Sequence, residues 1–197
     1  MVKRDAMNRL LPWVITVGLL VAAWFIAEAT PGDDAAERAF VQQAEIGERA
    51  EGRDIAITVQ RVRAAEALST PAGWRAEGTW VVVEMDAEAV ISEYGNLLGR
   101  TVLKVGDRVY SATERGEGES SVDDYMLSGE QLVPGIPKSG MLAFQLPGDE
   151  SLTGTATLEI ATDRFTAYDS IITLPIDLGE LPVESSIELE MVEWTGA

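Results

Sequence analysis

The fold class follows from the stretch Trp80-Val81-Val82-Val83-Glu84-Met85-Asp86-Ala87-Glu88-Ala89. Apolar side chains occupy the odd positions from 81 to 89, and acids occupy positions 84, 86 and 88. This alternation is typical of a β-strand that turns one face to a core and the other to water. Val83 is therefore expected in the core and Glu84 in solvent, where Glu84→Gln should change stability little.

The same alternation recurs in shorter segments on both sides of this strand. These segments are residues 55–59, 101–105, 108–112, 142–146, 156–160, 172–176 and 187–191. Gly106-Asp107 predicts a hairpin turn, and Val62, which is out of phase with Val59, predicts a bulge or a strand end. Seven or eight strands in about 150 residues predict an all-β fold, either an antiparallel sandwich or a barrel.

The N-terminal region predicts one transmembrane helix. Residues 10–27 form an 18-residue run without charge, which is at the lower limit of the length that crosses a bilayer as a helix. Basic residues precede the run and acids follow it, which by the positive-inside rule places the rest of the chain outside the cell membrane. Two alternatives are a signal peptide cleaved near Ala27-Glu28-Ala29 and a helix buried in a core.

The chain is thus expected to have four regions. They are a cytoplasmic N-terminus at 1–9, a membrane anchor at 10–29, a linker at 30–45 and a β-sandwich domain at 46–197. Within the linker, Asp33-Asp34 can cap a short helix that continues through Gln43.

The composition excludes several kinds of chemistry. The chain has 0 Cys and 0 His, so it can form no disulfide, no Cys/His zinc site and no catalytic triad that needs these residues. The net charge is −18, and that of the part after the apolar run is about −20 at neutral pH. Such a surface repels nucleic acid and anionic lipid headgroups. We expect no enzymatic activity, no cofactor and no nucleic-acid partner.

Several segments together resemble a known family. They are residues 44–49 with 55–59, residues 80–85, the hairpin at 103–110, and the late Pro-Gly, Gly, Phe and Pro pattern at 132–147. The family is an immunoglobulin-like domain of unknown function from exported and membrane-anchored proteins of Gram-positive bacteria, labelled by analogy with telomeric repeat-binding factor 2. It is similar to the secreted mycobacterial immunogenic protein with an immunoglobulin-like sandwich.

The resemblance covers about residues 46–178 and implies an immunoglobulin-like antiparallel β-sandwich. It implies no enzymatic activity and no established ligand. One position departs from the family pattern, because Asp86-Ala87-Glu88-Ala89 stands where the family usually has an asparagine after the central strand.

Three residues are candidate contacts for a partner. Trp74 lies in a loop before the central strand and could serve as an exposed anchor, or it could fold over the edge of the sandwich. Pro134 and Ile136 flank Gly135, where the chain could form a recognition loop or a rigid turn into the next strand.

The acidic residues suggest two further sites. A polar loop at 111–126 contains Asp123 and Asp124, which could bind calcium or could simply be solvated. Paired carboxylates can hydrolyse glycosides, but no feature selects a pair among the 33 acids.

Two classes of function fit these observations. The first is a membrane-anchored interaction module that binds or supports another envelope or membrane protein with a basic surface. The second is a ligand-binding or sensory ectodomain for a cation or a cell-wall component. An extended contact patch would favour the first, and a pocket with converging polar groups would favour the second.

Overall fold

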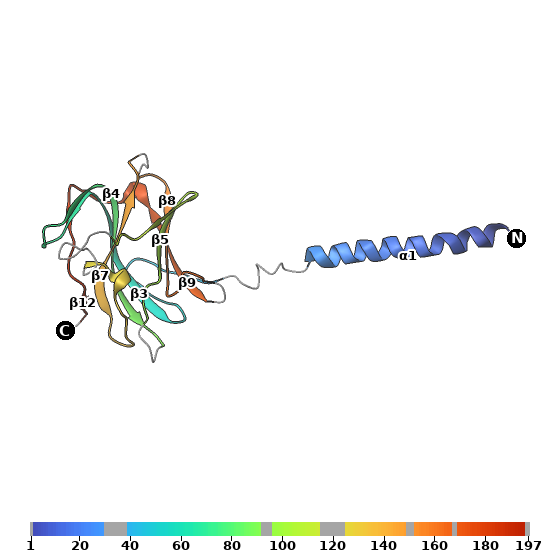
Figure 1. Cartoon of the computed structure of the whole chain (residues 1–197), viewed down its shortest axis with the longest axis horizontal. Helices are drawn as coiled ribbons and strands as arrows, with labels where there is room; N and C mark the ends of the chain where they lie inside the picture. Colours follow the sequence, from blue (N-terminus) through green and yellow to red (C-terminus); the bar gives the residue numbers. More distant parts are fainter. Residues whose placement is uncertain are drawn as a thin grey trace. The chain divides into compact units, whose positions relative to one another are not determined.

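The computed structural model describes residues 2–29, 39–91, 96–114, 125–148, 152–166 and 169–195. The chain divides into two units, Met1–Arg38 and Ala39–Ala197. The first contains the helix α1 (Val2–Ala29), which begins earlier than the predicted anchor (Figure 1). Where the structure describes the side chains of α1, at residues 12–13 and 15–28, no stretch is both long and apolar enough to cross a membrane.

The second unit is a sandwich of two β-sheets, one labelled by β5, β8 and β9 and the other by β3, β4, β7 and β12 in Figure 1. The five-stranded sheet has the order β1 (Phe40–Gln43), β9 (Ser170–Asp177), β8 (Thr155–Ala161), β5 (Arg100–Val105) and β6 (Arg108–Ser111). The seven-stranded sheet has the order β10 (Val183–Glu184), β3 (Ile55–Ser69), β4 (Arg75–Ala89), β7 (Lys138–Leu146) and β12 (Glu193–Trp194). Its other strands, β2 (Arg49–Glu51) and β11 (Ile187–Glu188), also pair with β3. The predicted β-sandwich is therefore confirmed.

Most neighbouring strands run antiparallel, as the alternating sequence predicts. The exceptions are β1 beside β9, and β10 and β11 beside β3, which are parallel. In the described part of the chain, short 3₁₀ turns at Leu127–Gly129 and Leu178–Glu180 lie outside the sheets. The hairpin at Gly106 joins β5 to β6, and Gly106 has a φ of 56°, which favours glycine.

A β-bulge in β3 explains why Val62 is out of phase with Val59. The register of β3 against β4 shifts between Val59 and Arg61, so that Gln60 is the extra residue. After the bulge, Arg61 pairs with Glu84 and Val62 pairs with Val83. The bulge therefore returns Val62 to the core and places Arg61 beside an acid.

The segment expected to be a helix through Gln43 ends instead as strand β1. Its four residues pair in parallel with the edge of β9. The Phe40 amide donates to the Asp169 carbonyl at 2.8 Å, and the Ala44 amide donates to the Thr173 carbonyl at 2.8 Å. Pairing with an open sheet edge satisfies these backbone groups and overrides the local helical composition. The compact unit consequently begins at Ala39 rather than at residue 46.

The main core lies between the two sheets. Its fully buried side chains include Val83, Leu103, Phe144 and Leu158. A second apolar cluster covers part of the opposite face of the seven-stranded sheet and contains Trp80, Val82 and Leu189 among others. The central strand is thus covered by apolar residues on both faces along part of its length.

Candidate functional site

The outer face of the seven-stranded sheet, which points away from the main core, is divided into two halves. Along β4 its side chains are first apolar, at Trp80 and Val82, and then acidic, at Glu84, Asp86 and Glu88. The C-terminal segment lies across this face, because β11 pairs with β3 whereas β12 pairs with β7. The outer face is therefore the part of the sandwich in which charged and apolar surfaces meet.

The apolar half contains Trp74, one of the predicted contact residues. Its ring packs edge-on against the buried Trp80, with the ring centroids 6.4 Å apart and an interplanar angle of 74°. Aromatic rings favour this arrangement because the positive edge of one meets the negative face of the other. Trp74 is half-buried, so it folds over the sheet and presents only part of its ring to solvent.

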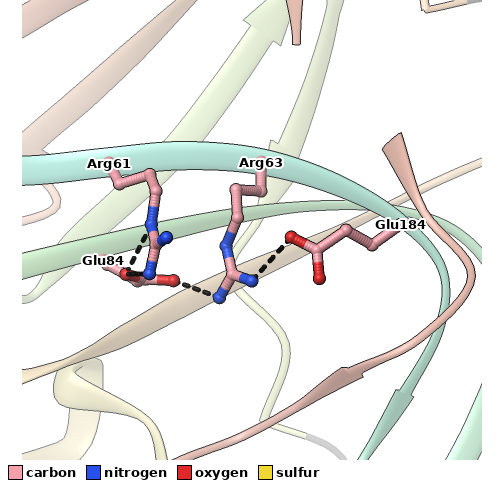
Figure 2. Close-up of polar contacts among 4 residues, drawn as sticks. All are labelled: Arg61, Arg63, Glu84 and Glu184. Atoms are coloured by element: carbon pink, nitrogen blue, oxygen red, sulfur yellow. Dashed lines mark hydrogen bonds and ion pairs between the residues drawn. The ribbon is translucent and has the colours of Figure 1, made fainter. Parts of the chain in front are cut away.

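The charged half contains an ion-pair network around Glu84 (Figure 2). The Arg61 guanidinium donates to Glu84 with a nitrogen–oxygen distance of 2.7 Å, and the Arg63 guanidinium donates to the other oxygen of the same carboxylate. Arg63 also donates to Glu184 of β10 at 2.7 Å. The expectation that Glu84 lies freely in solvent is therefore wrong, because the bulge in β3 places two arginines beside it.

Arg63 is the most enclosed cation of this network, with 13% of its side chain exposed. Burial acts to lower the pKa of the Arg63 guanidinium, but hydrogen bonds to Glu184 and Glu84 outweigh it and raise that pKa above its ordinary value. Arg63 thus stays charged, and the network holds β10 against β3.

A second ion pair extends the charged half toward β2. Arg49 donates to Glu88 at 2.8 Å and also to Glu51. Hydrogen bonds to Glu51 and then Glu88 raise the pKa of Arg49. Glu84 and Glu88 are consequently neutralised, whereas Asp86 between them has no ion-pair partner among the described residues.

A groove of about 360 Å³ lies beside Asp86, between the sheet and the C-terminal segment. We call it the acidic groove, and it is lined by Gln60, Glu84, Met85, Asp86, Ser139, Gly140, Met141, Glu190, Met191 and Glu193. The described residues that line it include four carboxylates and no cation. Asp86 is held in place, because its carboxylate accepts from Ser139 Oγ at 2.5 Å and from Gln60 Nε2 at 2.8 Å.

The structure separates the residues that the sequence suggested as partner contacts. Trp74 precedes the start of β4, whereas Pro134 forms a bridge with Ala89 at the end of that strand. Fifteen residues of strand place them roughly 45 Å apart, too far for one compact site. Gly135 has a φ of 75° and lies between the bridged pair Val133 and Ile136, which is the geometry of a tight turn.

The calcium candidates Asp123 and Asp124 lie outside the described residues. Within the described ranges, no group of three or more acidic side chains is arranged to hold a metal ion. The acidic groove leaves no local pattern in the sequence, because its residues come from β3, β4, β7 and the C-terminal segment. The run of acids at positions 188, 190 and 193 is the one signal in the sequence that pointed to it.

Comparison with solved structures finds several proteins of distant similarity. No protein-family model matches it, and no curated protein matches it. A candidate lipoprotein from Staphylococcus aureus is 10% identical with a TM-score of 0.47, over 74% of this chain and 99% of that one. An uncharacterized β-sandwich protein from Clostridium difficile 630 is 13% identical with a TM-score of 0.47, over 75% and 100% of the two chains. The yjhA protein from Bacillus subtilis is 17% identical with a TM-score of 0.44, over 66% and 99%.

Proposed function

We propose that the chain is a non-enzymatic interaction module that binds a basic segment of another envelope or membrane protein in the acidic groove. The observation that carries this proposal is the groove itself, where carboxylates of β4 and of the C-terminal segment line one hollow without a lining cation. The net charge of −18 supports it, because a strongly acidic surface attracts basic partners over long range.

The acidic groove offers a lysine or arginine an apolar contact for its aliphatic stem and carboxylates for its charged head. Met191, which is 60% exposed, can pack against the aliphatic stem, while Glu190 and Asp86 lie in the same lining to meet the charged head. Asp86 is already oriented by Ser139 and Gln60, so less side-chain entropy is lost on binding.

We further propose that the sandwich lies outside the cell and is held at the membrane by the charge-free run at 10–27. Support comes from the sequence, where basic residues precede that run and acids follow it. A tether of this kind raises the effective concentration of the module toward other membrane proteins. The immunoglobulin-like family is proposed on the motif order described above, and the two-sheet sandwich is compatible with it.

The same groove also supports a second candidate function, as a receptor for a small cationic ligand. Its volume of about 360 Å³ and its converging polar groups are typical of small-molecule sites. The two functions differ in the size of what binds. A free polyamine should saturate the groove in the second case, whereas the basic segment of a partner protein should be required in the first.

The test is to recover the tagged full-length protein from detergent-solubilised native membranes at low and at high ionic strength. We expect a partner at low salt, its loss at high salt, and its loss at low salt in the double variant Glu190→Gln/Glu193→Gln. The matched control is Glu77→Gln/Glu180→Gln, which removes the same charge from two exposed positions outside the groove. Equal recovery with both double variants would exclude the groove as the contact, and turnover of an envelope substrate by the purified protein would contradict a non-enzymatic role.

Two measurements test the proposed location. Alkaline extraction of membranes should leave the protein in the membrane fraction, and protease added to wall-free cells should digest the sandwich. Release of the intact protein by alkali, or full protection of the sandwich, would refute this part of the proposal.

A further inference from the structure

The five-stranded sheet ends at β6, whose outer edge pairs with no described strand and approaches β7 toward its C-terminal end, at Thr113. The Ala112 amide donates to the Thr101 carbonyl at 3.0 Å, which fixes the phase of the ladder between β5 and β6. In an antiparallel ladder alternate residues point their backbone groups outward. The N–H and C=O groups of Val109 and Ser111 therefore point away from β5, and no described strand pairs with them.

A groove runs along this open edge. One hollow of about 370 Å³ is lined by Val109, Tyr110, Ser111, Ala112, Thr113, Glu114 and Gln145. A second hollow of about 530 Å³ shares Tyr110 and Gln145 with the first and continues to Glu66 and Gly78. We call the two hollows together the edge groove. It shares no residue with the acidic groove, so it is a separate surface.

Two buried polar atoms at the edge groove have no hydrogen-bond partner among the described residues. Thr113 lines the first hollow and is 7% exposed, yet its hydroxyl is unpaired. The indole nitrogen of Trp80, which is fully buried, is also unpaired, and a β-carbon on Gly78 of the second hollow would lie only 3.4 Å from it. A buried polar group without a partner costs about 1–3 kcal/mol, so a bound segment that supplies a hydrogen bond to such a group would remove this cost.

The backbone of β7 adds a further polar group to this groove. The Thr113 amide donates to the Ala143 carbonyl at 2.7 Å, which shows that Ala143 points its backbone groups away from β4. Gln145, two residues further on, faces the same way, because the pattern repeats every second residue. The groove is thus bordered by outward backbone groups from both sheets and by the side-chain amide of Gln145.

We propose that the edge groove binds an extended, basic peptide segment of a partner, which adds to β6 as a further strand. An extended chain presents an N–H and a C=O at every second residue, and this spacing matches Val109 and Ser111. Glu114 lies in the first hollow and Glu66 in the second, so both hollows favour a cationic side chain. The strand β6 has only four residues, which limits the paired part of the segment to about that length.

The first experiment uses the full-length protein in detergent and the probe peptide acetyl-Lys-Thr-Val-Thr-Val-Lys-amide. Nuclear magnetic resonance measures hydrogen exchange at the Val109 and Ser111 amides. In the free protein both amides should exchange quickly, and the peptide should slow them by about tenfold or more as it binds. A peptide of the same sequence with alternate backbone nitrogens methylated should have no such effect.

Three variants test the geometry of this binding. Ser111→Pro removes an outward N–H at an edge position and should weaken peptide binding by about tenfold or more. Thr113→Val removes the unpaired hydroxyl with little change in shape and should weaken binding several-fold, whereas Thr157→Val on β8 should not. Glu190→Gln/Glu193→Gln should leave the peptide's protection of the Val109 and Ser111 amides unchanged, which keeps this result separate from that of the acidic groove.

Several outcomes would overturn the proposal. They are protection of the two amides in the free protein, protection that rises with protein concentration alone, equal binding of the methylated peptide, and no binding at millimolar peptide. Loss of binding in the variant of the acidic groove would also overturn it, because the peptide would then occupy that groove.

Discussion

The substitution Glu84→Gln tests the ion-pair network of the outer face most directly. It removes one negative charge that two guanidinium groups share, and it keeps the volume of the side chain. Glutamine can still accept one hydrogen bond, and Arg63 keeps its contact with Glu184. The perturbation is therefore confined to the loss of two charge-assisted interactions.

The exposure of each pair determines the expected change in the free energy of unfolding. Arg61 is 59% exposed, so its pair with Glu84 should contribute less than about 1 kcal/mol. Arg63 and Glu84 are 13% and 18% exposed, and breaking a largely buried pair costs about 3–5 kcal/mol when no other partner remains. Since Glu184 remains, we expect a total loss of about 2 kcal/mol.

Urea denaturation followed by tryptophan fluorescence measures this loss. With a denaturant slope of about 2 kcal/mol per molar urea, the midpoint should fall by about 1 M. The matched control is Glu77→Gln, at an exposed position of the same strand, which should stay within about 0.5 kcal/mol of the wild type. Equal midpoints for Glu84→Gln and Glu77→Gln would refute the reasoning and restore the expectation of a solvated Glu84.

Three further predictions concern the core, the response to acid and the acidic groove. Val83→Asp places an unpaired charge in the main core and should abolish the cooperative urea transition, whereas Val109→Asp, at a position that is 55% exposed, should keep it. Burial raises the pKa of the Glu159 carboxyl, but hydrogen bonds from Lys104 and Arg100 outweigh it and hold that pKa below its ordinary value. The stabilisation that the charged Glu159 gives the folded protein is present above the unfolded-state pKa of about 4.3. It is lost as the pH falls through the folded-state pKa. The destabilisation caused by Glu159→Gln should therefore be full at pH 7 and shrink in acid, and urea midpoints at several pH values check it. Glu190→Gln/Glu193→Gln should leave the midpoint unchanged or raise it slightly, by less than about 1 kcal/mol, because it removes like charges from one groove.

The inner face of the sandwich could be predicted from the sequence because burial leaves a local signal. Val83 and Phe144 each lie in a run of alternating apolar residues, and a strand with one dry face requires that pattern wherever it occurs. The bulge before Val62 was visible for the same reason, since an extra residue shifts the phase of the alternation. Both features are encoded by residues that are adjacent in the sequence, so they could be predicted from it.

Features that depend on pairing between distant segments left no such signal. The residues of β1 form a strand only because the edge of β9 is available, and nothing near Gln43 in the sequence indicates that edge. Likewise, the acid at Glu84 looks solvated in its own strand. Its environment is set by Arg61 and Arg63, which reach the same face only after the bulge in β3.

The outer face contains an arrangement of like charges that supports the proposed binding in the acidic groove. Leu189 of the C-terminal segment packs in the same buried apolar cluster as Trp80, and β11 and β12 pair the segment with β3 and β7. These contacts hold the segment on the sheet. Beyond Leu189 the same segment brings Glu190 and Glu193 to the hollow where Asp86 already lies, although like charges in one groove oppose each other. Neutral or basic residues at these two positions would pack there at lower cost. Like charges gathered in one groove do not favour folding. They are expected where a site binds a partner of opposite charge.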